Sequence, residues 1–251
     1  MLLEDRVAIV TGGGKGIGSI YSQGLAREGA KVVVADIDFT AAKEVAERIR
    51  ADGADAIAVD VDIASPESTV EMARAANSTF GRIDILINNA SLMSALPRRP
   101  WHEIPVGEWD AVMAVNLRGM FLCCLAVFPT MKDRRYGKIV NISSSRIYEG
   151  MPNRLHYTTS KAGVVGFTRA LAREVGEDNI CVNAISPGFT QSDTQVATSS
   201  AEYMKAHIDR RCFKREEYPQ DLVGTVIFLS SSQSDFMTGQ LLNVDGGYSM
   251  H

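Results

Sequence analysis

Residues 157–161 read YTTSK and place a phenol and an ammonium group, Tyr157 and Lys161, four residues apart. Side chains at helix positions i and i+4 share a face, so the two groups are expected to point the same way. A tyrosine hydroxyl titrates near pH ~10 and is a poor base at neutral pH. A neighbouring ammonium lowers the pKa of the phenol and makes it a usable general acid and base. The alternative is a chance pair on a helix surface, and the rest of the chain has to decide between them.

Two further polar residues belong to the same hypothesis. Ser144 lies in the stretch NISSS, directly after a predicted strand at residues 137–143, and could hold the substrate oxygen whose proton Tyr157 handles. Asn116 interrupts an apolar helical stretch, VMAVNL, where an amide is unfavourable without a specific partner. We expect Asn116 to hold a water molecule that connects Lys161 to solvent.

A glycine-rich turn follows the first predicted strand. The stretch TGGGKGIG, residues 11–18, precedes a helical segment, so its backbone can approach a pyrophosphate while the helix N-terminus faces the anion. The alternative is an ordinary glycine-rich turn, and the acidic end of the next predicted strand argues against it. The loop residues expected to contact a dinucleotide are Gly12, Lys15, Gly16, Ile17 and Gly18.

Asp36 bears on the choice of dinucleotide. A carboxylate at this strand end accepts hydrogen bonds from an adenosine ribose and repels a 2′-phosphate, which favours NAD(H). Lys15 could reach such a phosphate, so NADP(H) is not excluded. Other expected cofactor contacts follow the third and fourth predicted strands: Asp60, Val61, Asn88 and Ala90. For Asp60 and Val61, an ordinary polar strand end explains the sequence equally well.

Short β-branched runs alternate with helical patterns along the chain. The predicted strands are 7–11, 31–36, 56–61, 83–88, 137–143, 180–186 and 241–245. Several are apolar on both faces, as in a parallel sheet covered by helices on each side. The fold class is therefore α/β, a Rossmann-type doubly wound parallel sheet of about seven strands with helices on both faces. We expect a single domain, 1–251, in which the polar segment 190–218 acts as a lid.

Composition excludes several function classes. The 251 residues carry 26 Lys and Arg against 30 Asp and Glu, a formal charge of −4, which argues against nucleic acid or an anionic membrane as the main partner. The four cysteines form no ligand cluster, so no metal site is expected. No secretory signal or membrane-length apolar run is apparent, and the expected location is cytoplasmic.

These motifs in this order resemble the short-chain dehydrogenase/reductase family, in its compact single-domain branch. The motifs that carry the resemblance are TGGGKGIG, Asp36, NNAS, Asn116, NISSS, YTTSK, SPGFTQS and LLNVDGG. The resemblance implies a nicotinamide cofactor, a homotetramer and a catalytic tetrad of Asn116, Ser144, Tyr157 and Lys161. It also implies that Pro187 and Gly188 lie beside the nicotinamide and that Ser192 helps to hold its carboxamide. Ser91 and Ser192 depart from the family pattern, where glycine and often threonine occur.

The expected reaction is NAD(H)-dependent hydride transfer to or from a secondary alcohol or ketone. Ser144 and Tyr157 are expected to contact this substrate, with Phe189 as an apolar wall. Arg146 is either an anchor for a substrate carboxylate or a solvated loop arginine. One alternative is an NADPH-dependent reductase of 3-oxoacyl thioesters on acyl carrier protein, docked by Arg210, Arg211, Lys214 and Arg215. A less favoured alternative is a non-catalytic NAD-binding sensor.

Overall fold

One parallel sheet organises the chain. The computed structural model describes residues 1–93, 96–192 and 201–250. The sheet consists of β1 (Val7–Thr11), β2 (Lys31–Asp36), β3 (Ala56–Asp60), β4 (Ile85–Asn88), β5 (Gly137–Ile142), β6 (Ile180–Pro187) and β7 (Leu241–Val244). Its order is β3-β2-β1-β4-β5-β6-β7, and each pair of neighbours is parallel. The seven predicted strands and the doubly wound fold are confirmed.

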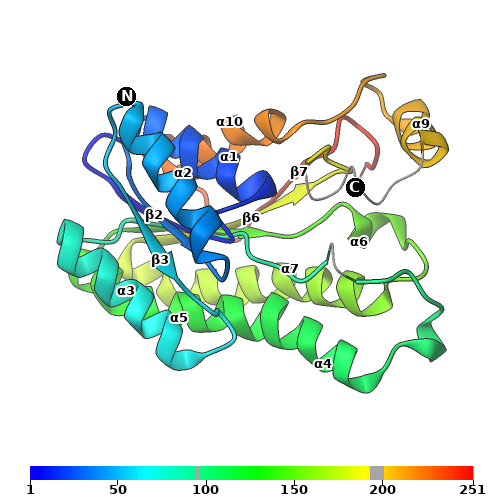
Figure 1. Cartoon of the computed structure of the whole chain (residues 1–251), viewed down its shortest axis with the longest axis horizontal. Helices are drawn as coiled ribbons and strands as arrows, with labels where there is room; N and C mark the ends of the chain where they lie inside the picture. The colour runs from blue at the N-terminus through cyan, green and yellow to red at the C-terminus, as the bar shows by residue number, and fades with distance from the viewer. Residues whose placement is uncertain (94–95, 193–200, 251) are drawn as a thin grey trace.

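Helices cover both faces of this sheet (Figure 1). On one face lie α1 (Gly16–Arg27), α2 (Phe39–Ala51) and α10 (Pro219–Ser230), and on the other lie α3 (Pro66–Phe80), α5 (Met120–Arg134) and α7 (Leu155–Val175). Strand residues alternate between the two cores, because successive side chains point to opposite faces. In β1, Ala8 and Val10 enter the first core and Val7 and Ile9 the second, which explains the continuous apolar runs in the sequence.

The topology places a ligand crevice at the carboxyl ends of the central strands. β1 lies between β2 and β4, so the winding of the chain reverses between β1 and β4. Ligands of doubly wound folds bind at such a switch point, outside the carboxyl ends of the strands. The glycine loop, the segment after β4 and the serines after β5 all leave the sheet at this edge.

One apolar helical segment spans Val106–Arg134. It contains α4 (Val106–Met113), a π-helical turn at Ala114–Gly119 (η2) and α5. By length and composition it could cross a membrane, with a mean hydropathy of 2.0 in its most apolar window, which the sequence analysis did not predict. That window is 44% buried inside the molecule. Cys123, Val127 and Met131 pack on the sheet, so α5 is a core helix of the fold.

The segment proposed as a lid is helical in part. Helix α9 (Ala201–Arg210) lies within it, and α10 begins directly after it at Pro219. Residues 193–200 of this segment lie outside the described residues, so the lid remains a prediction. A single domain likewise remains a prediction, although the one sheet draws strands from Val7 to Val244.

Candidate active site

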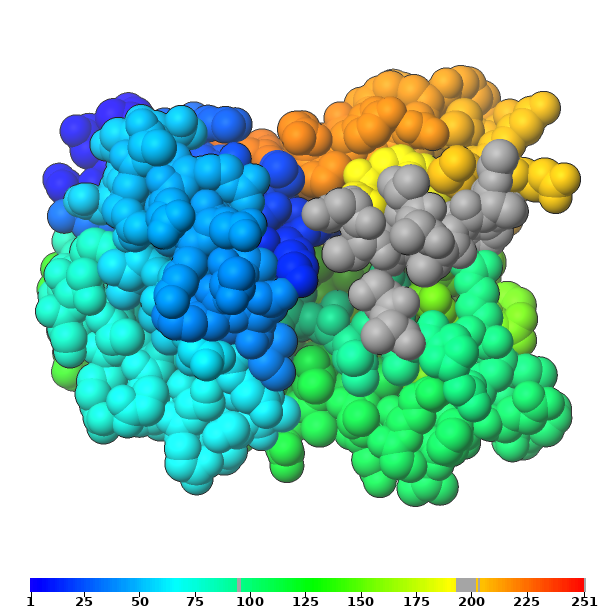
Figure 2. All heavy atoms as spheres, viewed as in Figure 1, coloured from blue at the N-terminus to red at the C-terminus, as the bar shows by residue number. Residues whose placement is uncertain are grey.

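A cleft of about 450 Å³ runs along the carboxyl ends of the strands. The space-filling view shows the surface hollowed between the blue N-terminal elements and the green and yellow elements of the other half (Figure 2). The volume lies in the range of small-molecule and cofactor sites. The cleft residues that were expected from the sequence are Gly12, Lys15, Gly16, Ile17, Gly18, Asp36, Val61, Ala90, Ser144, Arg146, Tyr157, Lys161, Pro187, Gly188, Phe189 and Ser192.

The glycine loop is built to approach an anion closely. Gly12 has a φ of 62°, in the left-handed region that favours glycine, and a Cβ added at Gly18 would collide with the carbonyl oxygen of Gly12. The Asn89 amide donates to the carbonyls of Thr11 and Gly12, both at 3.0 Å, and fixes the turn. Helix α1 begins without a side-chain cap from Lys15, which leaves its first N–H groups for a ligand. These features fit a dinucleotide pyrophosphate.

Gly18→Ala tests this close approach. We expect the variant to lose about 1–3 kcal/mol of unfolding free energy and to bind dinucleotide more weakly, because the new methyl group must push the turn apart. Chemical denaturation and calorimetric titration with NADH measure the two effects. Gly224→Ala is the matched control, since a Cβ there meets nothing within 4 Å. It should stabilise its helix by ~0.5–1 kcal/mol, and equal behaviour of the two variants would contradict the close-packed loop.

Two carboxylates lie at the end of the cleft where the adenosine was expected (the adenosine end). Asp36 accepts from the backbone N–H of Gly14 at 2.9 Å and of Asp38 at 3.0 Å, which orients its carboxylate at the tip of β2. Asp38 forms an ion pair with Lys15, with Nζ 2.5 Å from Oδ2. The hydrogen bond from Lys15 lowers the pKa of Asp38. Lys15 was expected to favour a 2′-phosphate, against the effect of Asp36. It already has a carboxylate partner, Asp38, which the sequence analysis missed.

A reciprocal clamp joins β5 to α7 at the chemical end. Ser143 Oγ donates to the Lys161 carbonyl at 2.8 Å, and Lys161 Nζ donates to the Ile142 carbonyl, also at 2.8 Å. Tyr157 and Lys161 share one helix face, and Lys161 Nζ lies 5.8 Å from the centroid of the Tyr157 ring. Ser144 lies near enough to the Tyr157 hydroxyl to lower its pKa. The fold thus brings Ser144, Tyr157 and Lys161 together, as their spacing predicted.

The electrostatics of Tyr157 differ from the sequence prediction. Burial raises the pKa of its hydroxyl, and this effect outweighs the lowering by the Ser144 hydrogen bond and by the charges of Arg146 and Arg154. Burial also lowers the pKa of Lys161 to about 8. The prediction that Lys161 lowers the pKa of Tyr157 below its ordinary value is therefore wrong for the protein alone. Two arginines, which that prediction did not include, supply the opposing charge.

Asn116 occupies the π-helical turn between α4 and α5. Its Oδ1 accepts from the Leu92 N–H at 2.7 Å, and its Nδ2 donates to the Leu92 carbonyl at 3.3 Å and to Ser160 Oγ at 3.0 Å. Ser160 Oγ donates in turn to the Tyr157 carbonyl at 2.7 Å. The amide therefore ties the segment after β4 to the helix of the catalytic pair. Both polar atoms of the Asn116 side chain take part in these bonds. The bonds do not test the water relay expected for Asn116, which remains a prediction.

Aromatic rings and an arginine form the opposite, substrate end of the cleft. His207 stacks between Phe189 and Tyr248, with ring centroids 5.1 and 5.0 Å away. Burial, followed by the charges of nearby arginines, lowers the pKa of His207 to about 4, so this cleft residue is neutral at neutral pH. Arg146 lines the cleft as the first residue of α6 (Arg146–Glu149) and is not a fully solvated loop residue.

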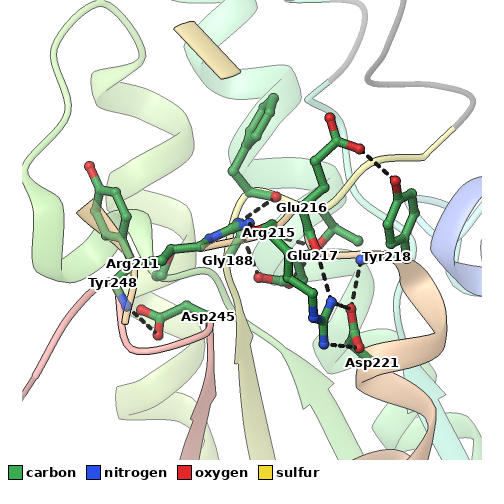
Figure 3. A network of polar contacts seen from close by, with 12 residues as sticks. Gly188, Arg211, Arg215, Glu216, Glu217, Tyr218, Asp221, Asp245 and Tyr248 are labelled. Carbon is green, nitrogen blue, oxygen red and sulfur yellow. Dashed lines mark hydrogen bonds and ion pairs between the residues drawn. The ribbon is translucent and has the colours of Figure 1, made fainter. Parts of the chain in front are cut away.

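A buried ion pair supports the turn at the end of β6 (Figure 3). Arg211 Nη2 lies 3.3 Å from Glu217 Oε2 and donates to the Phe189 carbonyl at 2.7 Å. Thr190 Oγ1 donates to Glu217 Oε1 at 2.7 Å, and burial raises the pKa of Glu217 to about 7. A Cβ at Gly188 would collide with Glu217 Oε2, so glycine is required where this carboxylate meets the cleft wall.

Two predicted cofactor residues lie outside the cleft. Asp60 is exposed at the end of β3, and Asn88 is buried, where its Nδ2 donates to Asn141 Oδ1 at 2.9 Å. Their neighbours Asp62 and Asn89 line the cleft instead. The sequence analysis also missed Ile37 and His207, which line it as well. Across residues 1–93, 96–192 and 201–250, no group of three His, Cys, Asp or Glu is placed to hold a metal ion.

Comparison with known proteins identifies the family to which this chain belongs. A family model described as enoyl-(acyl carrier protein) reductase matches residues 12–249. The 5-keto-D-gluconate 5-reductase of Escherichia coli strain K12 is 34% identical over 246 residues, 98% of this chain and 96% of that protein. A (2S)-[(R)-hydroxy(phenyl)methyl]succinyl-CoA dehydrogenase subunit of Thauera aromatica is 35% identical over 252 residues, 100% of this chain and 99% of that protein.

Solved structures agree with these relatives. The 3-ketoacyl-(acyl-carrier-protein) reductase of Brucella melitensis, complexed with NADH, superimposes with a TM-score of 0.90 at 33% identity and covers 99% of this chain and 100% of that one. Sequence and fold therefore agree over almost the whole chain, and the protein belongs to the short-chain dehydrogenase/reductase family of oxidoreductases.

Proposed function

We propose that this oxidoreductase transfers a hydride between NAD(H) and a secondary alcohol or ketone, with Tyr157 as general acid and base. The observation that carries the proposal is the meeting of Ser144, Tyr157 and Lys161 in the same cleft as the glycine loop. A non-catalytic NAD-binding sensor would have no need for this constellation. The cleft contains a candidate proton-transfer group, a hydroxyl that can hold the substrate oxygen and a candidate cofactor loop, and this combination supports an enzyme over a sensor.

Each side chain has a separate task in this proposal. A bound nicotinamide supplies or takes up the hydride. Ser144 holds the substrate oxygen, and Tyr157 gives a proton to that oxygen in reduction or removes it in oxidation. Lys161 would hold the nicotinamide ribose and, with the cofactor bound, would stabilise the phenolate. Pro187 and Gly188, which line the cleft, would lie beside the nicotinamide, and Ser192, buried in the cleft wall, would help to hold its carboxamide.

Asp36 makes NAD(H) the preferred cofactor. Its carboxylate at the tip of β2 would lie against a 2′-phosphate, and Lys15, the nearby loop cation, is paired with Asp38. Asp36→Ser should therefore raise the ratio of kcat/KM for NADP(H) over NAD(H) on the order of tenfold to a hundredfold, about 1.4–2.8 kcal/mol. Steady-state kinetics with both cofactors measure the ratio. Asp55→Ser, on the surface before β3, is the control, and an unchanged ratio in Asp36→Ser would contradict the assignment.

The reaction class is tested with a panel of secondary alcohols and ketones. Each compound is run with NAD(H) and with NADP(H), and the nicotinamide absorbance is followed. We expect turnover of at least one compound class with NAD(H). Turnover of 3-oxoacyl thioesters alone, with NADPH preferred, would overturn the proposal in favour of the carrier-protein alternative.

That alternative has support from the Brucella melitensis structure but loses part of its expected docking surface. Of the four cations proposed to form it, Arg211 is buried and paired with Glu217, and Arg215 is paired with Asp221 at 2.7 Å. Lys214 donates to the Asp209 carbonyl at 2.7 Å, and the Arg210 guanidinium lies over the Tyr248 ring. These contacts bind the segment to its own fold, so they favour a free small substrate over a carrier protein.

We also propose a homotetramer located in the cytoplasm. Phe121 and Leu125 are exposed on α5, and Phe213 and Met250 are exposed near the C-terminal end of the chain. These apolar residues on a long helix and near the last strand support interfaces there. Light scattering coupled to size exclusion measures the assembly.

A further inference from the structure

The two ends of the cleft carry different charged groups. At the adenosine end, Asp36 and Asp62 line it, with Lys15 as the cleft cation. At the substrate end, Arg146 and Glu149 line it, and Arg146 is the one arginine among the described lining residues. The substrate end therefore presents one guanidinium, beside one carboxylate, in a chain that is acidic as a whole, at −4.

Arg146 is held at the reacting centre by the chain around it. It lies two residues after Ser144, the serine near Tyr157, and its backbone N–H donates to Ser144 Oγ at 3.4 Å. Its charge lowers the pKa of both Tyr157 and His207, although burial sets the overall direction at Tyr157. The guanidinium is therefore electrostatically close to the proton-transfer group and to the aromatic wall at the same time.

The other arginines at this end have defined structural contacts. Arg154 donates to the carbonyls of Met93 and Leu96, and Arg211 donates to Glu217 and Phe189. Arg210 lies over the ring of Tyr248. None of these three is among the described lining residues of the cleft, and Arg146 is.

The acidic groups nearby limit what Arg146 can bind. Glu149 also lines the cleft and accepts from Ser145 Oγ at 2.9 Å. Glu217 and Asp245 lie behind the wall, where Glu217 is paired with Arg211, and Asp245 accepts from the N–H groups of residues 247–249. A dianionic phosphate would bring two charges close to Glu149. A monoanionic carboxylate is matched by one guanidinium, which can bind both of its oxygens.

We propose that Arg146 binds a carboxylate of the substrate, so that the enzyme acts on small hydroxy acids and the corresponding keto acids. This inference rests on the proposed hydride transfer at Tyr157 and adds the substrate class. The neutral His207 fits it, since an uncharged ring in the wall leaves Arg146 as the group that selects for charge.

Matched pairs of an acid and its neutral counterpart test the proposal. We compare kcat/KM with NAD⁺ within three pairs: lactate with 2-propanol, 3-hydroxybutyrate with 2-butanol, and D-gluconate with D-sorbitol. Binding of each compound to the NADH-loaded enzyme is measured by calorimetry, which needs no turnover. We expect at least one acid to be preferred over its counterpart by about tenfold or more. Arg146→Gln should weaken binding of that acid and raise its KM by about 10–100-fold, as for a lost charge-assisted hydrogen bond.

The variants separate this inference from the proposed function. Arg146→Gln should lower kcat/KM for the acids by a larger factor than for the neutral alcohols, which it affects only through the pKa of Tyr157. Arg146→Lys should restore part of the acid affinity. Arg173→Gln, at an exposed arginine in the last turn of α7, should behave as wild type. Equal loss for acids and neutral alcohols in Arg146→Gln would overturn the carboxylate contact. So would preference for the neutral member of every pair, which would still leave hydride transfer intact. No oxidation of any compound, with no acid bound to the NADH-loaded enzyme, would count against both.

Discussion

Tyr157→Phe is expected to lower kcat by about 10²–10⁴-fold, the usual contribution of a positioned general acid or base. The ring stays, so the buried helix face of α7 stays packed and the affinity for NADH should change little. The substitution removes the hydroxyl near Ser144 and leaves no other phenol in the cleft lining of the described chain. Single-turnover kinetics and calorimetric titration with NADH separate the two effects.

Tyr136→Phe is the matched control. Tyr136 has the same chemistry but lies at the opposite edge of the sheet, before β5, where Arg6 stacks on its ring 3.9 Å from the centroid. This variant should keep full turnover. If Tyr157→Phe turned over at the rate of the control, Tyr157 would have no part in proton transfer and the proposed mechanism would fail.

The pH profile gives a second readout of the same residue. Burial raises the pKa of Tyr157, so the phenol stays protonated up to higher pH than an ordinary tyrosine and is prepared to donate. As a base in alcohol oxidation it acts only once deprotonated, so the oxidation rate of the wild type should rise with pH. The residual rate of Tyr157→Phe should lack this rise. If the wild type and Tyr157→Phe showed the same pH profile, the rise in rate with pH would come from the titration of another group.

Local pattern was enough to predict the fold and the catalytic pair. Strands with apolar residues on both faces follow from short β-branched runs, and helix periodicity alone places Tyr157 and Lys161 on one face. Ser144 could be added because the carboxyl ends of parallel strands meet at one edge of the sheet. Each of these inferences needs only the sequence of one helix or strand, or the general rule that the carboxyl ends of parallel strands meet at one edge of the sheet.

The wrong cofactor assignments, Asn88 and Asp60, lie at strand ends, where a shift of one or two residues decides whether a side chain faces the cleft. Asn88 and Asn89 are chemically identical, yet the last residue of β4 points into the core and the next one holds the glycine loop. Asp60 is exposed at the end of β3, and Asp62, two residues farther along the chain, lines the cleft. Sequence pattern gives strand ends within a few residues, whereas a side chain reverses its direction with each step. The charge pair of Arg211 with Glu217 was also missed, because the two residues are six positions apart and no helix or strand spacing connects them.

Arg211→Met should destabilise the protein more than Gly18→Ala, Asp36→Ser or Tyr157→Phe. Arg211 and Glu217 have side chains only 3% and 6% exposed, so removing the cation leaves a carboxylate buried without its partner. Breaking a buried pair from one side costs about 3–5 kcal/mol of unfolding free energy. The pair also holds Phe189 and the turn at Gly188, so the KM for substrate should rise in the fraction that folds.

The dependence on pH has a definite sign. The folded-state pKa of Glu217 is raised from 4.5 to about 7, so the folded protein binds this proton more tightly than the unfolded chain. The stability that comes from this proton is fully present below the unfolded value and is lost as the pH rises through about 7. Without Arg211 the carboxylate is harder still to ionise. The loss in Arg211→Met should therefore be largest above pH 7 and smaller near pH 5.

A double-mutant cycle isolates the pair. Glu217→Gln removes the charge, so Arg211→Met combined with Glu217→Gln should recover much of the stability and lose the steep dependence on pH. Arg215→Met is the control, because its partner Asp221 belongs to an exposed pair that contributes about 0–1 kcal/mol. Urea denaturation at pH 5 and pH 8 gives all the values. Additive losses in the double variant would mean that the two side chains act independently, and the cleft wall would then owe its shape to the backbone hydrogen bonds alone.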